Sequence, residues 1–234
     1  MYIRKSDQRG RARFGWLDSH HSFSFGHYYD PQHMGWGALR VINDDEVAPG
    51  AGFDTHGHRD MEIISYVLQG SIRHRDNMGH ESVLKAGEIQ RMTAGTGILH
   101  SEFNDSRSEA LKFLQIWIMP DTQGLEPGYE QRELPQKGAL TDLVTPDGRG
   151  NSLKIHQDAV IQRLVLDSGE PIKLSTPEKR KGYLHIIRGK LIGNDQNALE
   201  GELSTGDAVG LRGGETLSIT ASRPVEALWF DLCG

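Results

Sequence analysis

Two short pairs of metal-binding residue types are the chemically most informative part of this 234-residue sequence: His56-Gly-His58 and His100-Ser-Glu102. Residues i and i+2 of a β-strand point to the same face, so each pair would present its two side chains side by side. Two such strands facing one another would enclose one cation between His56, His58, His100 and Glu102. Three imidazoles and one carboxylate suit a divalent transition metal (Fe, Mn, Ni, Cu, Co or Zn) and suit Mg or Ca poorly.

The segments that must position these residues are short apolar runs separated by Gly, Asp and Asn. Runs rich in Val, Ile, Tyr, Phe and Trp occupy 39–42, 62–68, 71–74, 88–92, 111–119, 140–144, 153–156, 160–166, 172–174, 183–187, 208–211, 216–220 and 225–232. In the first half, no segment sustains an amphipathic helical pattern over three turns. Turns at intervals of about 8 to 12 residues are typical of an all-β sandwich or barrel. We therefore predict an all-β fold.

Composition excludes several classes of function. Lys and Arg number 26 against 32 Asp and Glu, a net charge of −6, which disfavours a nucleic-acid or anionic-membrane partner. The single cysteine, Cys233, cannot form an intramolecular disulfide, which favours a reducing compartment. No apolar run approaches the roughly 20 residues of a membrane span, and the first residues lack the apolar core of a signal peptide. We expect a cytoplasmic monomer.

The glycines of the sequence indicate an internal repeat. One constant displacement of 119 residues carries Gly50, Gly70, Gly87 and Gly95 onto Gly169, Gly189, Gly206 and Gly214. Glycines mark turns that two copies of one fold would share. We therefore expect an N-terminal metal-binding domain over 1–130 and a C-terminal domain over 131–234, joined by a polar linker over 121–138.

The same displacement distinguishes the two copies chemically. It carries the four candidate ligands onto Ser175, Pro177, Ile219 and Ala221. This set offers no imidazole or carboxylate to a transition metal. The sequence therefore predicts a C-terminal domain without metal, which would shape the pocket, cover the first domain or bind a partner.

The glycine and histidine spacing resembles that of the cupins, a superfamily of jelly-roll barrels. Gly50, His56-Gly-His58, Glu62 and Gly70 are similar to the first cupin signature, and His100-Ser-Glu-Phe-Asn104 to the end of the second. Further blocks resemble the pirin family of bicupins, and they are Gly15-Trp-Leu-Asp-Ser19, Tyr28-Tyr-Asp-Pro31, His56-Gly-His-Arg-Asp-Met-Glu-Ile63, Ala94-Gly-Thr-Gly-Ile98 and Gln115-Ile-Trp-Ile-Met-Pro120. The similarity is greatest to bacterial pirin-like proteins with quercetin 2,3-dioxygenase activity.

The resemblance implies two tandem cupin barrels and one Fe²⁺ held by His56, His58, His100 and Glu102. It also implies a dioxygenase that cleaves the 2,3 bond of flavonols such as quercetin with dioxygen and releases carbon monoxide. Glu102 is the expected general base. Glu62 would not be a ligand; it would orient another group, act as a base or form a salt bridge.

Several alternatives stay open at this point. A pirin-type regulatory protein that acts through protein partners fits the same metal set, and so does a redox-neutral cupin, an isomerase or zinc hydrolase. Trp36, Phe53 and Met61 are candidate walls of a pocket for a flat aromatic substrate, or ordinary core residues. The His residues of 1–35 are expected to be hydrogen-bonded or at the surface, and the alternation over 22–25 predicts a half-buried strand.

Overall fold

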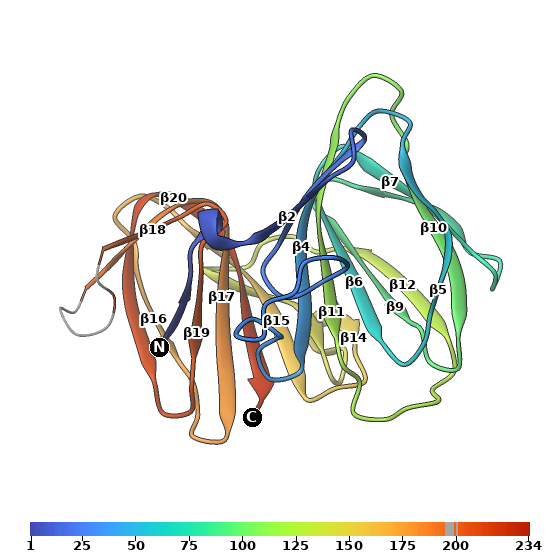
Figure 1. Cartoon of the computed structure of the whole chain (residues 1–234). Helices are drawn as coiled ribbons and strands as arrows, with labels where there is room; N and C mark the ends of the chain where they lie inside the picture. Colours follow the sequence, from blue (N-terminus) through green and yellow to red (C-terminus); the bar gives the residue numbers. More distant parts are fainter. Residues whose placement is uncertain (195–198, 200) are drawn as a thin grey trace.

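The computed structural model describes residues 1–194, 199 and 201–234, and it confirms the predicted all-β class. Within these residues the only helical turns are two 3-10 segments, η1 (Ser6–Gln8) and η2 (Arg149–Asn151). The described part of the chain thus has no helix with the length and apolar character needed to cross a membrane. The strands form two barrels that lie side by side (Figure 1).

The first barrel consists of two sheets. The larger has seven strands in the order β12 (Gly128–Glu133), β9 (Glu88–Thr93), β6 (Glu62–Gln69), β11 (Leu111–Ile118), β4 (Leu39–Val47), β3 (Leu17–His21) and β2 (Gly10–Arg13). The smaller has four strands in the order β5 (Gly52–His58), β10 (Ile98–Asn104), β7 (Ser71–Asp76) and β8 (Glu81–Lys85). Both predicted ligand pairs lie on the smaller sheet, on the neighbouring strands β5 and β10.

The second barrel is built from one nine-stranded sheet. Its main path is β1 (Tyr2–Arg4), β19 (Ala208–Leu211), β17 (Arg180–Gly193), β20 (Thr216–Cys233), β15 (Ala159–Leu166), β13 (Leu140–Thr145) and β14 (Leu153–Lys154), with β16 (Pro171–Ser175) on β20 and β18 (Glu202–Ser204) on β17. The first strand of the chain therefore pairs within the second barrel before the chain crosses to the first (Figure 1).

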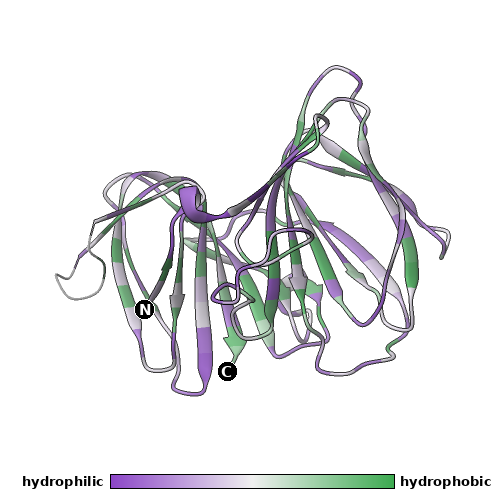
Figure 2. Ribbon diagram, in the orientation of Figure 1, coloured by the Kyte–Doolittle hydropathy of each residue, from purple (hydrophilic) through white to green (hydrophobic). Residues whose placement is uncertain are grey.

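Strand β6 explains how the two barrels adhere. Its sequence is apolar on both faces, and all but its last two residues are buried. Ile63 and Val67 point into the first barrel, whereas Ile64 and Tyr66 belong to a core cluster that includes Tyr183 and Phe230 of the second barrel. Alternate residues of a strand face opposite sides, so one strand contributes to both cores. Hydrophobic residues lie mostly along the strands (Figure 2).

The strand positions agree with the predicted repeat. Shifted by 119 residues, β4, β5 and β9 fall on β15, β16 and β19. The boundary at residue 130 stays a prediction; β12 runs from 128 to 133 and so continues past it.

Two local predictions are wrong. The linker assigned to 121–138 contains β12, whose polar residues pair with β9 along the edge of the larger sheet. Four of its five polar or aromatic side chains are half-buried and Glu133 is exposed, so the strand lacks the apolar signal of the others. The strand predicted over 22–25 is instead a loop, in which the Ser24 hydroxyl donates to the Asp30 carbonyl oxygen at 2.9 Å. Serine favours such local bonds over a sheet ladder.

Candidate metal centre

Strands β5 and β10 bring three histidines together. The two strands are antiparallel, with His56 opposite His100 and His58 opposite Ile98. The register shifts between His100 and Glu102, which lie opposite His56 and Phe53. Such a bulge changes the direction in which the strand presents its side chains.

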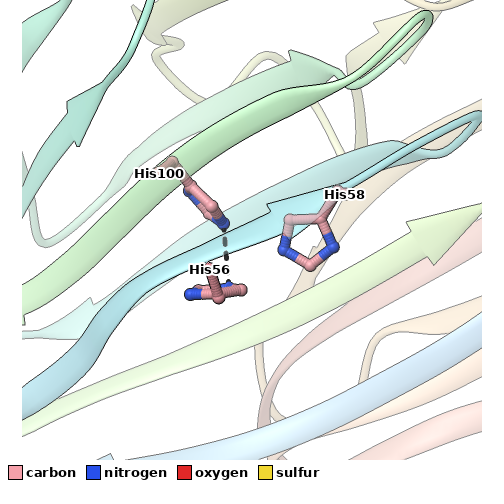
Figure 3. Close-up of side chains that lie close together, drawn as sticks. All are labelled: His56, His58 and His100. Carbon is pink, nitrogen blue, oxygen red and sulfur yellow. Dashed lines mark hydrogen bonds between the residues drawn. The ribbon is translucent and has the colours of Figure 1, made fainter.

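The three imidazoles converge on one point (Figure 3). One nitrogen from each of His56, His58 and His100 lies within 4.8 Å of the others. The Nε2 atoms of His56 and His100 are 3.1 Å apart. Two nitrogens that bind one ion at about 2.1 Å in adjacent positions are about 3 Å apart, so this spacing suits a shared metal ion.

A hydrogen bond fixes the tautomer of His56, and burial keeps the rings of His58 and His100 neutral. His56 Nδ1 lies 2.7 Å from the backbone oxygen of Asp54, which can only accept, so Nδ1 carries the hydrogen and Nε2 keeps its lone pair. Burial and the neighbouring imidazoles lower the pKa of His58 to about 4 and that of His100 to about 3. Both rings are therefore neutral near pH 7, as metal ligation requires.

Glu102 lies beside this group rather than within it. Its carboxylate oxygen, His100 and His74 form a second set of donors within 4.8 Å of one another. Oε1 of Glu102 accepts hydrogen bonds of 3.1 Å from Ser65 Oγ and from Gln90 Nε2, and Oε2 accepts one of 2.8 Å from Gln115 Nε2. The carboxylate is 2% exposed and fully engaged by these neighbours. The structure thus brings together three of the four predicted ligands and places the fourth next to His100.

His74 is the site residue that the sequence analysis missed. It lies on β7 directly opposite Glu102, and it is completely buried. Its Nε2–H donates to Oδ2 of Asp76 at 3.1 Å, while Nδ1 is buried without a partner in the described residues. A signal was present in the sequence, because His74-Arg-Asp76 has the same one-residue spacing of two ligand types as the pairs at 56/58 and 100/102.

Glu62 faces away from the metal site. It belongs to the side of β6 that faces the second barrel, where Oε1 lies 3.0 Å from His156 Nδ1 and Oε2 accepts a 3.1 Å bond from Thr93 Oγ1. Ser65, three residues further along the same strand, points to the opposite face and donates to Glu102. Because successive residues of a strand alternate between its two faces, Glu62 points away from the ligands. In the structure its carboxylate joins His156 of the second barrel to Thr93 of the first.

A large cavity of about 940 Å³ opens beside the histidines. Both sheets contribute to it, and its lining is Arg11, Ala12, Arg13, Phe14, Trp16, Leu17, Ser19, His21, Phe25, Gly26, His27, Tyr28, Asn43, Asp45, Gly52, Phe53, Asp54, His56, His58, Gln115 and Trp117. Of the three predicted wall residues, only Phe53 is among them. Met61 packs with Ile63 and Met92 instead, and Trp36 packs against Tyr2.

The aromatic walls of this cavity come mainly from the first thirty residues. Trp16 meets Phe53 edge to face with ring centres 5.2 Å apart, and Phe25 meets Trp117 in the same way at 5.3 Å. The ring of Trp117 also lies 5.0 Å from that of His58. Flat apolar walls next to metal-binding nitrogens suit an aromatic ligand with a polar edge.

Comparison with known proteins places the chain in a family. Residues 3–118 match the pirin family, and residues 143–232 match the quercetinase C-terminal cupin domain. A quercetin 2,3-dioxygenase of Escherichia coli strain K12 is 44% identical over 232 residues, which cover 99% of this chain and 98% of that protein.

Solved structures agree with this assignment. The bacterial pirin YhhW from Escherichia coli in complex with nickel(II) has a TM-score of 0.93 and 44% identity, covering 99% of this chain and 98% of that one. A quercetin 2,3-dioxygenase from Acinetobacter baumannii is 19% identical with a TM-score of 0.76, covering 100% of this chain and 86% of that one, and shares the fold. This chain therefore belongs to the pirin family and consists of two cupin domains.

Proposed function

We propose that this protein is a metal-dependent dioxygenase that cleaves the 2,3 bond of flavonols such as quercetin with dioxygen and releases carbon monoxide. The observation that carries the proposal is the convergence of the imidazoles of His56, His58 and His100, of which the first two line an aromatic cavity of about 940 Å³. The names of its relatives support the same reaction class.

The donor set fits one transition metal. His56, His58 and His100 would hold it, with Glu102 as the fourth ligand after a side-chain rotation toward them. We propose Fe²⁺ as the native ion; Zn, Mn, Ni, Cu and Co suit the same donors, and a related pirin binds nickel(II). When bound, the metal would supply a Lewis acid for the substrate oxygen and a redox-active centre for the reaction with dioxygen.

The protein's own residues would orient the substrate and move one proton. Trp16, Phe53 and Trp117 can hold the flat ring system with its 3-hydroxyl edge toward the histidines. Glu102 would take the hydroxyl proton: its buried carboxylate lies beside His100, and a rotation toward the cavity would exchange one of its hydrogen-bond donors for the substrate hydroxyl. Ser65 and Gln90, which donate to Oε1, would hold that oxygen while Oε2 exchanges its bond from Gln115. The cavity is complete within one chain, so we propose that a monomer suffices.

The test is quercetin turnover by protein whose metal content has been measured, with dioxygen uptake and carbon monoxide both recorded. His56→Ala and His100→Ala should lose at least about a hundredfold in turnover, because each removes a ligand. His20→Ala is the matched control, since His20 lies on β3 outside the cavity lining. Protein that is fully loaded with metal and leaves flavonols untouched would contradict the enzyme and favour a regulatory protein.

A further inference from the structure

The cavity has a second polar region that the proposed reaction does not use. Ser19, His21, Asn43 and Asp45 line it from β3 and β4 of the larger sheet, whereas His56 and His58 line it from β5 of the smaller sheet. All four residues are buried, with exposed fractions between 2% and 4%. We call this set the β3–β4 polar cluster.

Most of the β3–β4 polar cluster is internally satisfied. His21 Nδ1 lies 2.7 Å from Asn43 Oδ1 and 3.3 Å from the Ser19 hydroxyl. The His21 ring also packs against Phe25 and Tyr28, with ring centres 5.4 and 6.4 Å away. These contacts hold one edge of the cavity in a defined arrangement.

Asp45 is the exception. Its Oδ1 atom is buried and has no hydrogen-bond partner among the described residues. Burial raises the pKa of Asp45 to about 7, while the nearby Ser19 hydroxyl lowers it by less. A buried carboxyl without a full set of partners destabilises a fold unless a ligand completes them. Asp45 lines the cavity, so a molecule bound there can supply the missing bond.

We propose that Asp45 is a specificity-determining residue whose carboxyl group binds a substrate hydroxyl remote from the reacting centre. This inference rests on the proposed function and deepens it: the substrate is a flat aromatic with one polar edge at the histidines and a further hydroxyl toward β4. The aromatic side chains Trp16, Phe25 and Trp117 line the same cavity as both polar regions. A ligand without the second hydroxyl leaves the carboxyl unpaired and binds more weakly.

The test compares two flavonols in anaerobic binding and in turnover. Quercetin carries hydroxyls on its outer rings, whereas 3-hydroxyflavone keeps only the reacting 3-hydroxyl. Asp45→Ala in metal-loaded protein should lose about tenfold in affinity for quercetin and less than about twofold for 3-hydroxyflavone. Asp44→Asn is the matched control, because Asp44 is the neighbouring carboxylate on the opposite face of β4, near Arg9. It should leave both affinities unchanged.

Further measurements separate substrate recognition from a structural role. The melting temperature of Asp45→Ala should equal or exceed that of the wild type, since the unpartnered acid is removed. Asp45→Asn preserves the shape of the side chain, and it should weaken quercetin binding by a smaller factor than Asp45→Ala does. If Asp45→Ala does not fold, the affinities of Asp45→Asn for the two flavonols test the proposal instead.

Equal losses for the two flavonols, or none, would overturn the role of Asp45 even if turnover is intact. Wild-type protein that binds both flavonols without consuming dioxygen would overturn the proposed function while the affinity ratios still test Asp45. Wild-type protein that binds neither flavonol would overturn both.

Discussion

The two barrels of this protein share one framework but fill it differently. A shift of 119 residues places Leu184, Val209, Ile219 and Ala221 where the first barrel has Ser65, Gln90, His100 and Glu102. In the second barrel these four side chains belong to one buried apolar cluster. In the first, Glu102 and its partners form a buried hydrogen-bonded group beside the histidines.

The comparison shows what a metal centre requires beyond its ligands. A buried carboxylate such as Glu102 needs hydrogen-bond partners, and Ser65, Gln90 and Gln115 of the larger sheet supply them. At the four displaced positions the second barrel needs no such partners, because its side chains there are apolar and pack together. That it binds no metal stays a prediction, supported by the side chains at the four displaced positions.

The largest effect is expected when the first barrel is made to resemble the second. The double variant His100→Ile, Glu102→Ala should bind no transition metal and lose all flavonol turnover, because two of four proposed ligands are gone. Elemental analysis after purification and metal loading measures this. The same protein should remain folded by circular dichroism. Full metal occupancy in this variant would show that the ligands lie elsewhere.

A smaller effect is expected from Glu102→Gln. The amide nitrogen cannot accept the hydrogen bonds that the carboxylate receives from Gln90 or Gln115, and it cannot take a proton. Turnover should fall by about a hundredfold, the usual contribution of a general base, with lowered metal occupancy. Glu109→Gln, at an exposed glutamate, is the control. Wild-type turnover in the Glu102 variant would exclude this carboxylate as the base.

The stability of the metal-free protein should depend on pH through His100. Burial and its neighbours His56 and His74 lower its pKa to about 3. The ordinary value is about 6.5, so below this pH the unfolded chain binds more protons than the folded one. Stability from this group is complete above about pH 6.5 and falls as the pH falls toward the lowered value.

Denaturant unfolding at pH 7 and pH 5 tests this dependence. The loss for one such group between these pH values is roughly 2 kcal/mol at most. His100→Gln should remove that part of the loss. His185 in the second barrel has a similarly lowered pKa, and it is present in both proteins, so its contribution to the pH dependence remains in both. Identical pH dependence in the two proteins would contradict the expected contribution of His100.

The smallest effect on the metal centre is expected at Glu62, which occupies the usual cupin ligand position. Glu62→Gln should leave the metal content unchanged and reduce the free energy of unfolding by about 1 to 3 kcal/mol, because it weakens the buried contact with His156. His156→Ala should have a similar effect on stability. Loss of metal in Glu62→Gln would instead show that Glu62 is a ligand, and it would contradict the placement of Glu62 on the face of β6 away from the metal site.

The sequence by itself determined the all-β class, many of the strands, the repeat and the four candidate ligands. These features depend on local rules: the period of a strand places His56 beside His58, and repeated glycines mark shared turns. The resemblance to pirins added the expectation that Glu62 is not a ligand. Local patterns were sufficient because each pair of residues is adjacent in the chain.

Only the tertiary structure decided what surrounds those ligands. His74 meets Glu102 through the pairing of β7 with β10, and Asp45 reaches the cavity from the opposite sheet. The half-polar strand β12 forms because the edge of β9 is available to it. Each of these contacts joins residues far apart in the chain, so no spacing in the sequence encodes it. The partners of Glu102 come from three different strands, and only closure of the barrel brings them together.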